Sequence, residues 1–278
     1  RKLSEDRKGI YWNIQAKAAD NKLNSVLTWK NLKGQDIYGS LHTETDFFNI
    51  QGKAAAHVNV HTSKVLVDGT TWVVQPGDIV YHAKHLTIDH FAVTHGNQHV
   101  IIAGLATPNP KDSVVAELKN VDIAYILNLV NFHAVEFSGK ASGKAYIASA
   151  FNKPSASARL QIDDFRFEDG RMGTLYADSR WNEREGQIDI DAIAKDTVLN
   201  RMGERYVPLE TSIQGYVSPR KNNIELNIKA NGTRIEFLKS FCGSFIDRVD
   251  AFADGNVQVA GPLDKINLTG ELIANGSL

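Results

Sequence analysis

The 278-residue sequence has little cysteine, no long apolar run and almost no net charge, and each absence excludes a class of protein. A single cysteine, Cys242, excludes an intramolecular disulfide and a cysteine-based zinc site. No apolar run approaches the roughly 20 residues that cross a bilayer as a helix, and residues 1–8 lack the apolar segment of a signal peptide. The 31 basic and 32 acidic residues give a net charge of −1, without the basic excess that neutralises phosphates. We therefore expect no nucleic-acid partner.

Catalytic signatures are missing as well. The sequence contains no nucleophile elbow, no phosphate-cradling glycine loop and no dinucleotide fingerprint, so we expect a protein that is not an enzyme and needs no cofactor. Nine histidines are present, five of them between His82 and His99, but their spacings follow no ligand motif and predict no metal site. The acidic pair Asp189 and Asp191 falls on the polar face of an expected strand, where solvation explains it.

Alternation of apolar and polar residues is what the sequence does contain, along almost its whole length. Ile224, Leu226 and Ile228 share one parity, and the residues between them are polar. This two-residue period is typical of a strand with one dry face and one solvated face. Turn sequences such as Asp68-Gly69 separate the runs. The pattern predicts an all-β protein of about fifteen to twenty short antiparallel strands.

Two segments replace the alternation with a helical period. Ile123, Ile126, Leu127 and Val130 follow Asp122, a residue type that caps helix N-termini. In the second segment, residues 233–249, apolar side chains fall on a similar stripe. We expect two short amphipathic helices that pack against the sheet, because a short helix needs tertiary burial to be stable.

An internal repeat relates residues 123–162 to residues 235–274 at a constant offset of 112 positions. After the first apolar stretch of each copy, five positions are identical: Ala141/Ala253, Gly143/Gly255, Ala148/Ala260, Lys153/Lys265 and Leu160/Leu272. A repeated strand-rich unit indicates an elongated body in which each unit buries its apolar face against its neighbours. We expect a β segment over residues 1–112, continuous with a repeat-containing segment over 113–278. Gly143 and Gly255 should lie at equivalent places, where the strand begins or its backbone passes close to a neighbour.

Three stretches carry a resemblance to a known family. They are Gly139-Lys-Ala-Ser-Gly143 continuing to Leu160, Gly255-Asn-Val-Gln-Val-Ala-Gly-Pro-Leu263 continuing to Leu272, and Val65-Leu-Val-Asp-Gly-Thr-Thr-Trp72. Together they resemble the TamB family, the translocation and assembly module proteins of the Gram-negative envelope, which are related to AsmA-like proteins. The resemblance extends over most of the chain and is weakest in residues 1–60. Family members carry an amino-terminal membrane anchor, so the resemblance implies that this sequence is an internal segment.

A fold and a function follow from this resemblance. The implied fold is a long, strongly curved antiparallel sheet, a β-taco whose interior is an apolar groove. The implied function is non-catalytic: the groove binds phospholipid acyl chains and conducts them through the periplasm, between the inner and outer membranes. The full-length protein would be anchored in the inner membrane, with membrane contact through terminal regions outside this sequence.

Two alternatives to a lipid conduit fit the sequence. The first is a periplasmic scaffold for outer-membrane or autotransporter protein assembly that works with an Omp85-type partner and offers exposed strand edges. The second is a glycan-binding or adhesion domain, in which Trp12, Trp29, Trp72 and Trp181 would form an exposed platform. A conduit instead predicts these tryptophans in the lining or at the mouth of the groove.

An apolar sheet face needs a cover, which is either more protein or bound acyl chains. On periodicity alone, a closed sandwich core and an open groove both fit the sequence. An open groove should have a hydrophilic rim and no buried charge on its floor. Its lining is predicted from the alternation as Leu160, Ile162, Ile188, Ile190, Ile213, Ile224, Leu226, Ile228, Val257, Val259, Ile266, Leu268 and Leu272. We expect Ile224, Leu226 and Ile228 to share one buried face with the first four of these residues.

Overall fold

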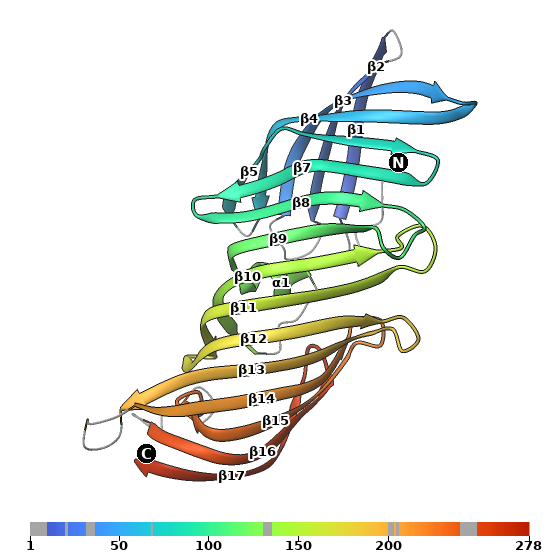
Figure 1. Cartoon of the computed structure of the whole chain (residues 1–278). Helices are drawn as coiled ribbons and strands as arrows, with labels where there is room; N and C mark the ends of the chain where they lie inside the picture. Colours follow the sequence, from blue (N-terminus) through green and yellow to red (C-terminus); the bar gives the residue numbers. More distant parts are fainter. Residues whose placement is uncertain are drawn as a thin grey trace. The chain divides into compact units, whose positions relative to one another are not determined.

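The chain is built almost entirely of antiparallel strands, which confirms the all-β prediction (Figure 1). The computed structural model describes residues 10–19, 22–31, 37–67, 69–129, 135–199, 203, 206–239 and 249–277. Within these ranges there are seventeen strands, which belong to one sheet, and the helix α1. No helix in the described ranges is long and apolar enough to span a membrane.

Two compact units make up the chain. The first comprises Arg1–Asn120 and Ala145–Ser155, and the second comprises Val121–Lys144 and Ala156–Leu278. The first of these boundaries falls after Asn120, within the strand Ser113–Asp122. The segment Ala145–Ser155, however, is grouped with the N-terminal strands and not with the repeats.

The first unit contains the strands that precede the repeat. They are β1 (Ile10–Ala19), β2 (Lys22–Asn31), β3 (Ile37–Ile50), β4 (Lys53–Val67), β5 (Thr70–Val74), β6 (Gly77–His82), β7 (His85–His95), β8 (Gln98–Ala106) and most of β9 (Ser113–Asp122). Strand β4 is long enough to pair with two partners, β5 along one half and β6 along the other. Strand β7 then pairs with both β5 and β6.

The second unit contains α1 and the repeat strands. They are α1 (Ile123–Leu129), most of β10 (Phe137–Ala148), most of β11 (Ser155–Phe167), β12 (Gly170–Asn182), β13 (Gln187–Leu199), β14 (Tyr206–Ser218), β15 (Asn223–Arg234), β16 (Asp250–Pro262) and β17 (Asn267–Ser277). From β11 onward, each strand pairs antiparallel with the next one along the chain. Strands β13 to β17 bend along their length, so this part of the sheet is curved, as expected (Figure 1).

The internal repeat is confirmed by the structure. Shifting β10 and β11 by the repeat offset gives residues 249–260 and 267–279, which nearly coincide with β16 and β17. A Cβ atom on Gly143 would lie 2.2 Å from the carbonyl oxygen of Arg159, and one on Gly255 would lie 2.2 Å from that of Glu271. Arg159 and Glu271 are themselves related by the same offset. The two glycines therefore make the predicted close approach at equivalent places.

The first predicted helix is confirmed and the second only in part. The Asp122 carboxylate accepts a hydrogen bond from the backbone N–H of Ala124 at 3.1 Å, which makes Asp122 the N-cap of α1. In the second segment, Thr233 and Arg234 still belong to β15, so helix cannot begin at residue 233. Leu238 and Lys239 are helical, and residues 240–248 lie outside the described residues.

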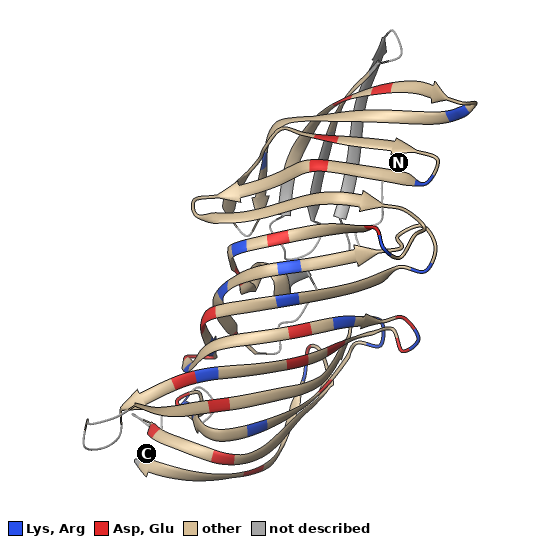
Figure 2. Ribbon diagram, viewed as in Figure 1, with Lys and Arg blue, Asp and Glu red and all other residues tan. Residues whose placement is uncertain are grey.

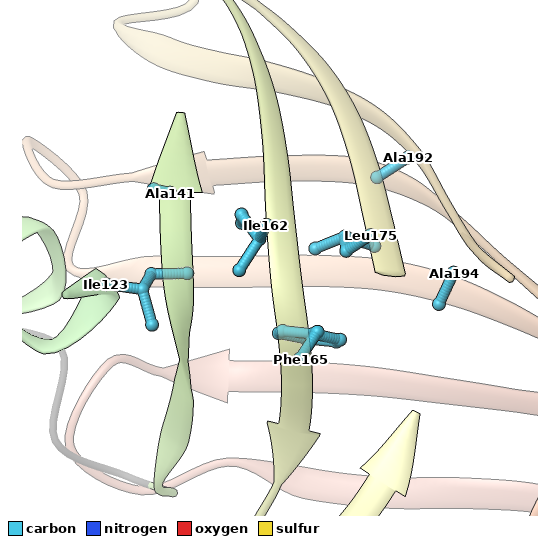
Figure 3. Close-up of a cluster of buried hydrophobic side chains, with 7 residues drawn as sticks. All are labelled: Ile123, Ala141, Ile162, Phe165, Leu175, Ala192 and Ala194. Carbon is cyan, nitrogen blue, oxygen red and sulfur yellow. The ribbon is translucent and has the colours of Figure 1, made fainter. Parts of the chain in front are cut away.

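Seven buried residues form a core between α1 and the sheet of the second unit (Figure 3). Ile123 comes from α1, and the other members come from four successive strands, β10 to β13: Ala141, Ile162, Phe165, Leu175, Ala192 and Ala194. Ala141 and its repeat counterpart Ala253 are both completely buried. Small residues at these positions let the chain pack closely over the sheet.

Candidate functional site

One face of the second unit carries the apolar residues of successive strands. Residues directly opposite each other in an antiparallel pair lie on the same face of a sheet. The registers join one such row across six strands: Leu160, Ala177, Ala192, Ile213, Ile228 and Val257. Neighbouring rows contain Ile188, Val217 and Ile224, and then Ile190, Leu226, Val259 and Leu268. We name the face that carries these rows, together with Ile162 and Leu175, the inner face. The prediction that the apolar residues of these strands share one face is confirmed.

The opposite face of the same strands, the outer face, is polar. A row across it contains Arg159, Asp178, Asp191, Gln214, Asn227, Gln258 and Thr269. Arg159 pairs with Asp178 at 2.8 Å, and Gln214 donates a hydrogen bond to Asp191 at 3.2 Å. Because these side chains are exposed, water satisfies most of their hydrogen-bonding capacity, as the alternating sequence indicates.

Helix α1 covers one part of the inner face. Ile162 and Ile224 are each only 3% exposed, because Ile123 of α1 belongs to the cluster around Ile162 and Leu127 packs against the clusters around both residues. The prediction that Ile162 and Ile224 line an accessible groove is therefore wrong. Both are core residues that a ligand cannot reach in this structure. Val259 is also buried, so it too departs from an accessible lining.

The rest of the predicted lining is only partly covered. Leu160, Ile188, Ile228 and Val257 are partly exposed and lie outside the three buried clusters of the described residues. A second group is partly buried at the borders of these clusters: Ile190, Ile213, Leu226, Ile266 and Leu272. Leu268, on β17, is exposed. The structure thus brings these residues together on one face, part of which α1 fills and part of which it leaves accessible.

A buried carboxylate at one end of the inner face was missed by the sequence analysis. Asp196 continues the parity of Ala192 and Ala194, and its side chain is 7% exposed. Arg171 approaches it at 3.0 Å and Arg234 at 3.2 Å. The expectation that no buried charge lies on this face is therefore wrong. The two guanidinium groups compensate the charge of Asp196. The position of Asp196 in the alternation, on the same parity as the apolar residues, was the signal that could have predicted its burial.

The pKa of the Asp196 carboxyl group lies below its ordinary value. Burial acts to raise the pKa, but hydrogen bonds from the backbone N–H of Thr197 and from Arg171 and Arg234 outweigh it. Asp196 is therefore an anion at neutral pH. The cluster lies near the end of β13, and apolar residues flank it on the same face: Leu209 lies opposite Asp196, and Val198 lies opposite Val207.

The tryptophan and histidine side chains that the structure describes do not form the sites considered from the sequence. Trp72, 4% exposed, cannot act as a glycan platform, and the side chains of Trp12 and Trp29 lie outside the described residues. Trp181 lies opposite Ile188 at the other border of the inner face, and the guanidinium carbon of Arg220 lies 5.1 Å from the centre of its ring. His57 pairs with Asp78 at 2.8 Å. Among the described residues, no three His, Cys, Asp or Glu side chains gather to hold a metal ion.

A hollow of about 690 Å³ lies on the outer face of β14 to β17. Polar residues dominate its lining, which contains Ser212, Gln214, Asn227, Lys229, Asn256, Gln258 and Thr269 together with Ile228, Val257 and Gly270. Hydroxyl and amide groups of this kind suit water or a polar solute, not an acyl chain. Of the predicted apolar lining, Ile228 and Val257 border this hollow, and the other eleven residues do not. No protein-family model matches the sequence, and neither a curated protein nor a solved structure matches it.

Proposed function

We propose that the second unit binds phospholipid acyl chains on the accessible part of its inner face and passes them along it. The observation that carries this proposal is the combination of register and exposure. Apolar side chains occupy one face across successive strands, and Ile188, Ile228 and Val257 on that face remain partly exposed. Contiguous apolar surface of this kind needs a cover in water.

An acyl chain supplies such a cover without specific chemistry. Each CH₂ group that leaves water contributes about 0.8 kcal/mol, so area alone retains a lipid tail on a lining of Ile, Leu and Val. Similar residues recur along the face because the chain is repetitive, and neighbouring positions therefore bind with similar affinity. This similarity supports movement from one position to the next with little selectivity between tails. The resemblance to the TamB family adds the proposed setting, the periplasm.

Native mass spectrometry of the purified chain tests the proposal directly, since it detects co-purified phospholipid. The sharpest variant is Ile228→Arg, because Ile228 lies on the inner face outside the buried clusters, and a long side chain there can reach water. We expect it to fold and to take up at least tenfold less lipid than the wild type.

A matched control is available on the same strand. Asn227 is adjacent, exposed and on the outer face, so Asn227→Arg introduces the same charge without touching the lining. Uptake by this control should equal that of the wild type. A wild-type chain that binds no phospholipid, or a folded Ile228→Arg variant with unchanged uptake, contradicts the proposal.

A further inference from the structure

Four connections of the first unit lie side by side and form what we name the turn edge. They are the β3–β4 turn, the β6–β7 turn, the β8–β9 loop and the β10–β11 loop (Figure 1). Ala55, near the start of β4, lies opposite His82 at the end of β6. Leu86, near the start of β7, lies opposite Ala106 at the end of β8. The Ser149 hydroxyl, directly after β10, donates a hydrogen bond to the Pro108 carbonyl oxygen at 3.1 Å.

Exposed apolar side chains concentrate at this edge. Of the twelve large hydrophobic residues that are exposed among those described, seven lie here: Phe47, Phe48, Ile50, Val80, Tyr81, Tyr146 and Ile147. The other five, Tyr176, Leu199, Tyr206, Leu268 and Ile273, are spread over four strands of the second unit. The rings of Tyr81 and Phe151 lie 6.2 Å apart, which joins the β6–β7 turn to the β10–β11 loop.

Both faces of the sheet are apolar at the turn edge. Successive residues of a strand point to opposite faces. The exposed residues include three consecutive pairs, Phe47 with Phe48, Val80 with Tyr81, and Tyr146 with Ile147, so each pair exposes one side chain on each face. A protein partner that packs on one face would leave half of these side chains in water. The interface of a bilayer surrounds an inserted edge and covers both faces.

The charge of the turn edge is basic, although the whole chain carries a net charge of −1. Each of the four connections contains or adjoins one exposed lysine: Lys53 is the first residue of β4, and Lys84, Lys111 and Lys153 lie within their connections. The acidic residue within them is Asp112, which accepts a hydrogen bond from the Thr107 hydroxyl at 2.7 Å. Figure 2 shows the basic positions at these turns. Aromatic rings beside lysines are the composition that proteins place at a membrane–water interface.

We propose that the turn edge docks on the surface of a lipid bilayer, with its aromatic and aliphatic side chains at the headgroup level and its four lysines on anionic headgroups. The occupant is a membrane, because the apolar side chains face both ways and the charge complements anionic lipid. This inference concerns the first unit and does not rest on lipid binding by the inner face. It places membrane contact in the first unit, whereas the sequence led us to expect membrane contact through terminal regions outside this sequence.

Co-sedimentation with sucrose-loaded vesicles tests the proposal on the full chain. Vesicles contain phosphatidylcholine alone or with about one-third phosphatidylglycerol, at low ionic strength. We expect binding to the anionic vesicles and at least tenfold weaker partitioning to the neutral ones. Replacing all four lysines (Lys53→Gln, Lys84→Gln, Lys111→Gln and Lys153→Gln) should weaken partitioning by several hundredfold, at about fivefold for each lysine near the surface. The double variant Phe47→Ser with Phe48→Ser should weaken it at least tenfold.

Matched controls come from the second unit. Lys195, Lys229, Lys239 and Lys265 are exposed there, and their replacement by Gln changes net charge equally. Tyr206→Ser with Ile273→Ser removes two exposed apolar side chains. Both controls should bind like the wild type, and circular dichroism checks that each variant is folded. The proposal is overturned if the wild type binds neither vesicle, as a protein-docking edge would, or if the controls weaken binding as much as the turn-edge variants. Ile228→Arg should bind the vesicles like the wild type. The docking test therefore stays independent of the inner-face proposal, and failure of one does not decide the other.

Discussion

Asp196 is the residue whose surroundings make the clearest prediction. Its buried carboxylate is held by Arg171 and Arg234, and removal of the charge leaves Arg234, itself only 18% exposed, without its main partner. Asp196→Asn should lower the free energy of unfolding at pH 7 by about 2–3 kcal/mol, less than for a fully buried pair because Arg171 reaches solvent. Asp178→Asn, which breaks an exposed pair with Arg159, should change it by less than about 0.5 kcal/mol.

The pH dependence of stability follows from the lowered pKa of Asp196. A carboxyl group whose pKa is lower in the folded state stabilises the fold above its unfolded pKa, which is about 3.9 for aspartate. That contribution is lost as the pH falls through the folded pKa. Urea unfolding of the wild type and of Asp196→Asn should therefore give a difference that is full at pH 7 and shrinks below about pH 4. A difference that is independent of pH contradicts the ion-pair account.

Two equivalent strands, β10 and β16, allow the repeat to be tested by substitution. Alanine at Gly143 or Gly255 would place its Cβ atom 2.2 Å from a backbone carbonyl oxygen of the next strand, at φ values of +143° and +147°. Neither backbone can move without breaking the ladder, so each substitution should destabilise by more than about 2 kcal/mol. Thermal unfolding should show similar losses for both, whereas the exposed neighbour Asn256→Ala should cost less than about 0.5 kcal/mol. Unequal effects would mean that the two places are not equivalent.

Strands and α1 could be predicted because their signals are local. Alternation assigns Ile224, Leu226 and Ile228 to one face without knowledge of their neighbours, and Asp122 marks a helix start by its own side chain. Coverage of the sheet could not be predicted, because it depends on where α1 packs. Leu127 reaches both the cluster of Ile162 and that of Ile224, residues that are far apart in the sequence. Alternation alone gives no distinction between Ile224, which is buried, and Ile228, which is not.

The chain taken as a whole places two kinds of apolar surface in contact with water, and lipid should stabilise it through the inner face. A ligand that binds only the folded state adds RT ln(1 + [L]/Kd), about 2.7 kcal/mol at one hundred times Kd. Monomeric lysophosphatidylcholine, below its critical micelle concentration, should therefore raise the Tm by several degrees in differential scanning calorimetry. Ile228→Arg should lose this shift because its lining is interrupted. The four-lysine variant of the turn edge should keep it, because monomers present no membrane surface. A shift of equal size in Ile228→Arg would place the lipid elsewhere than on the inner face.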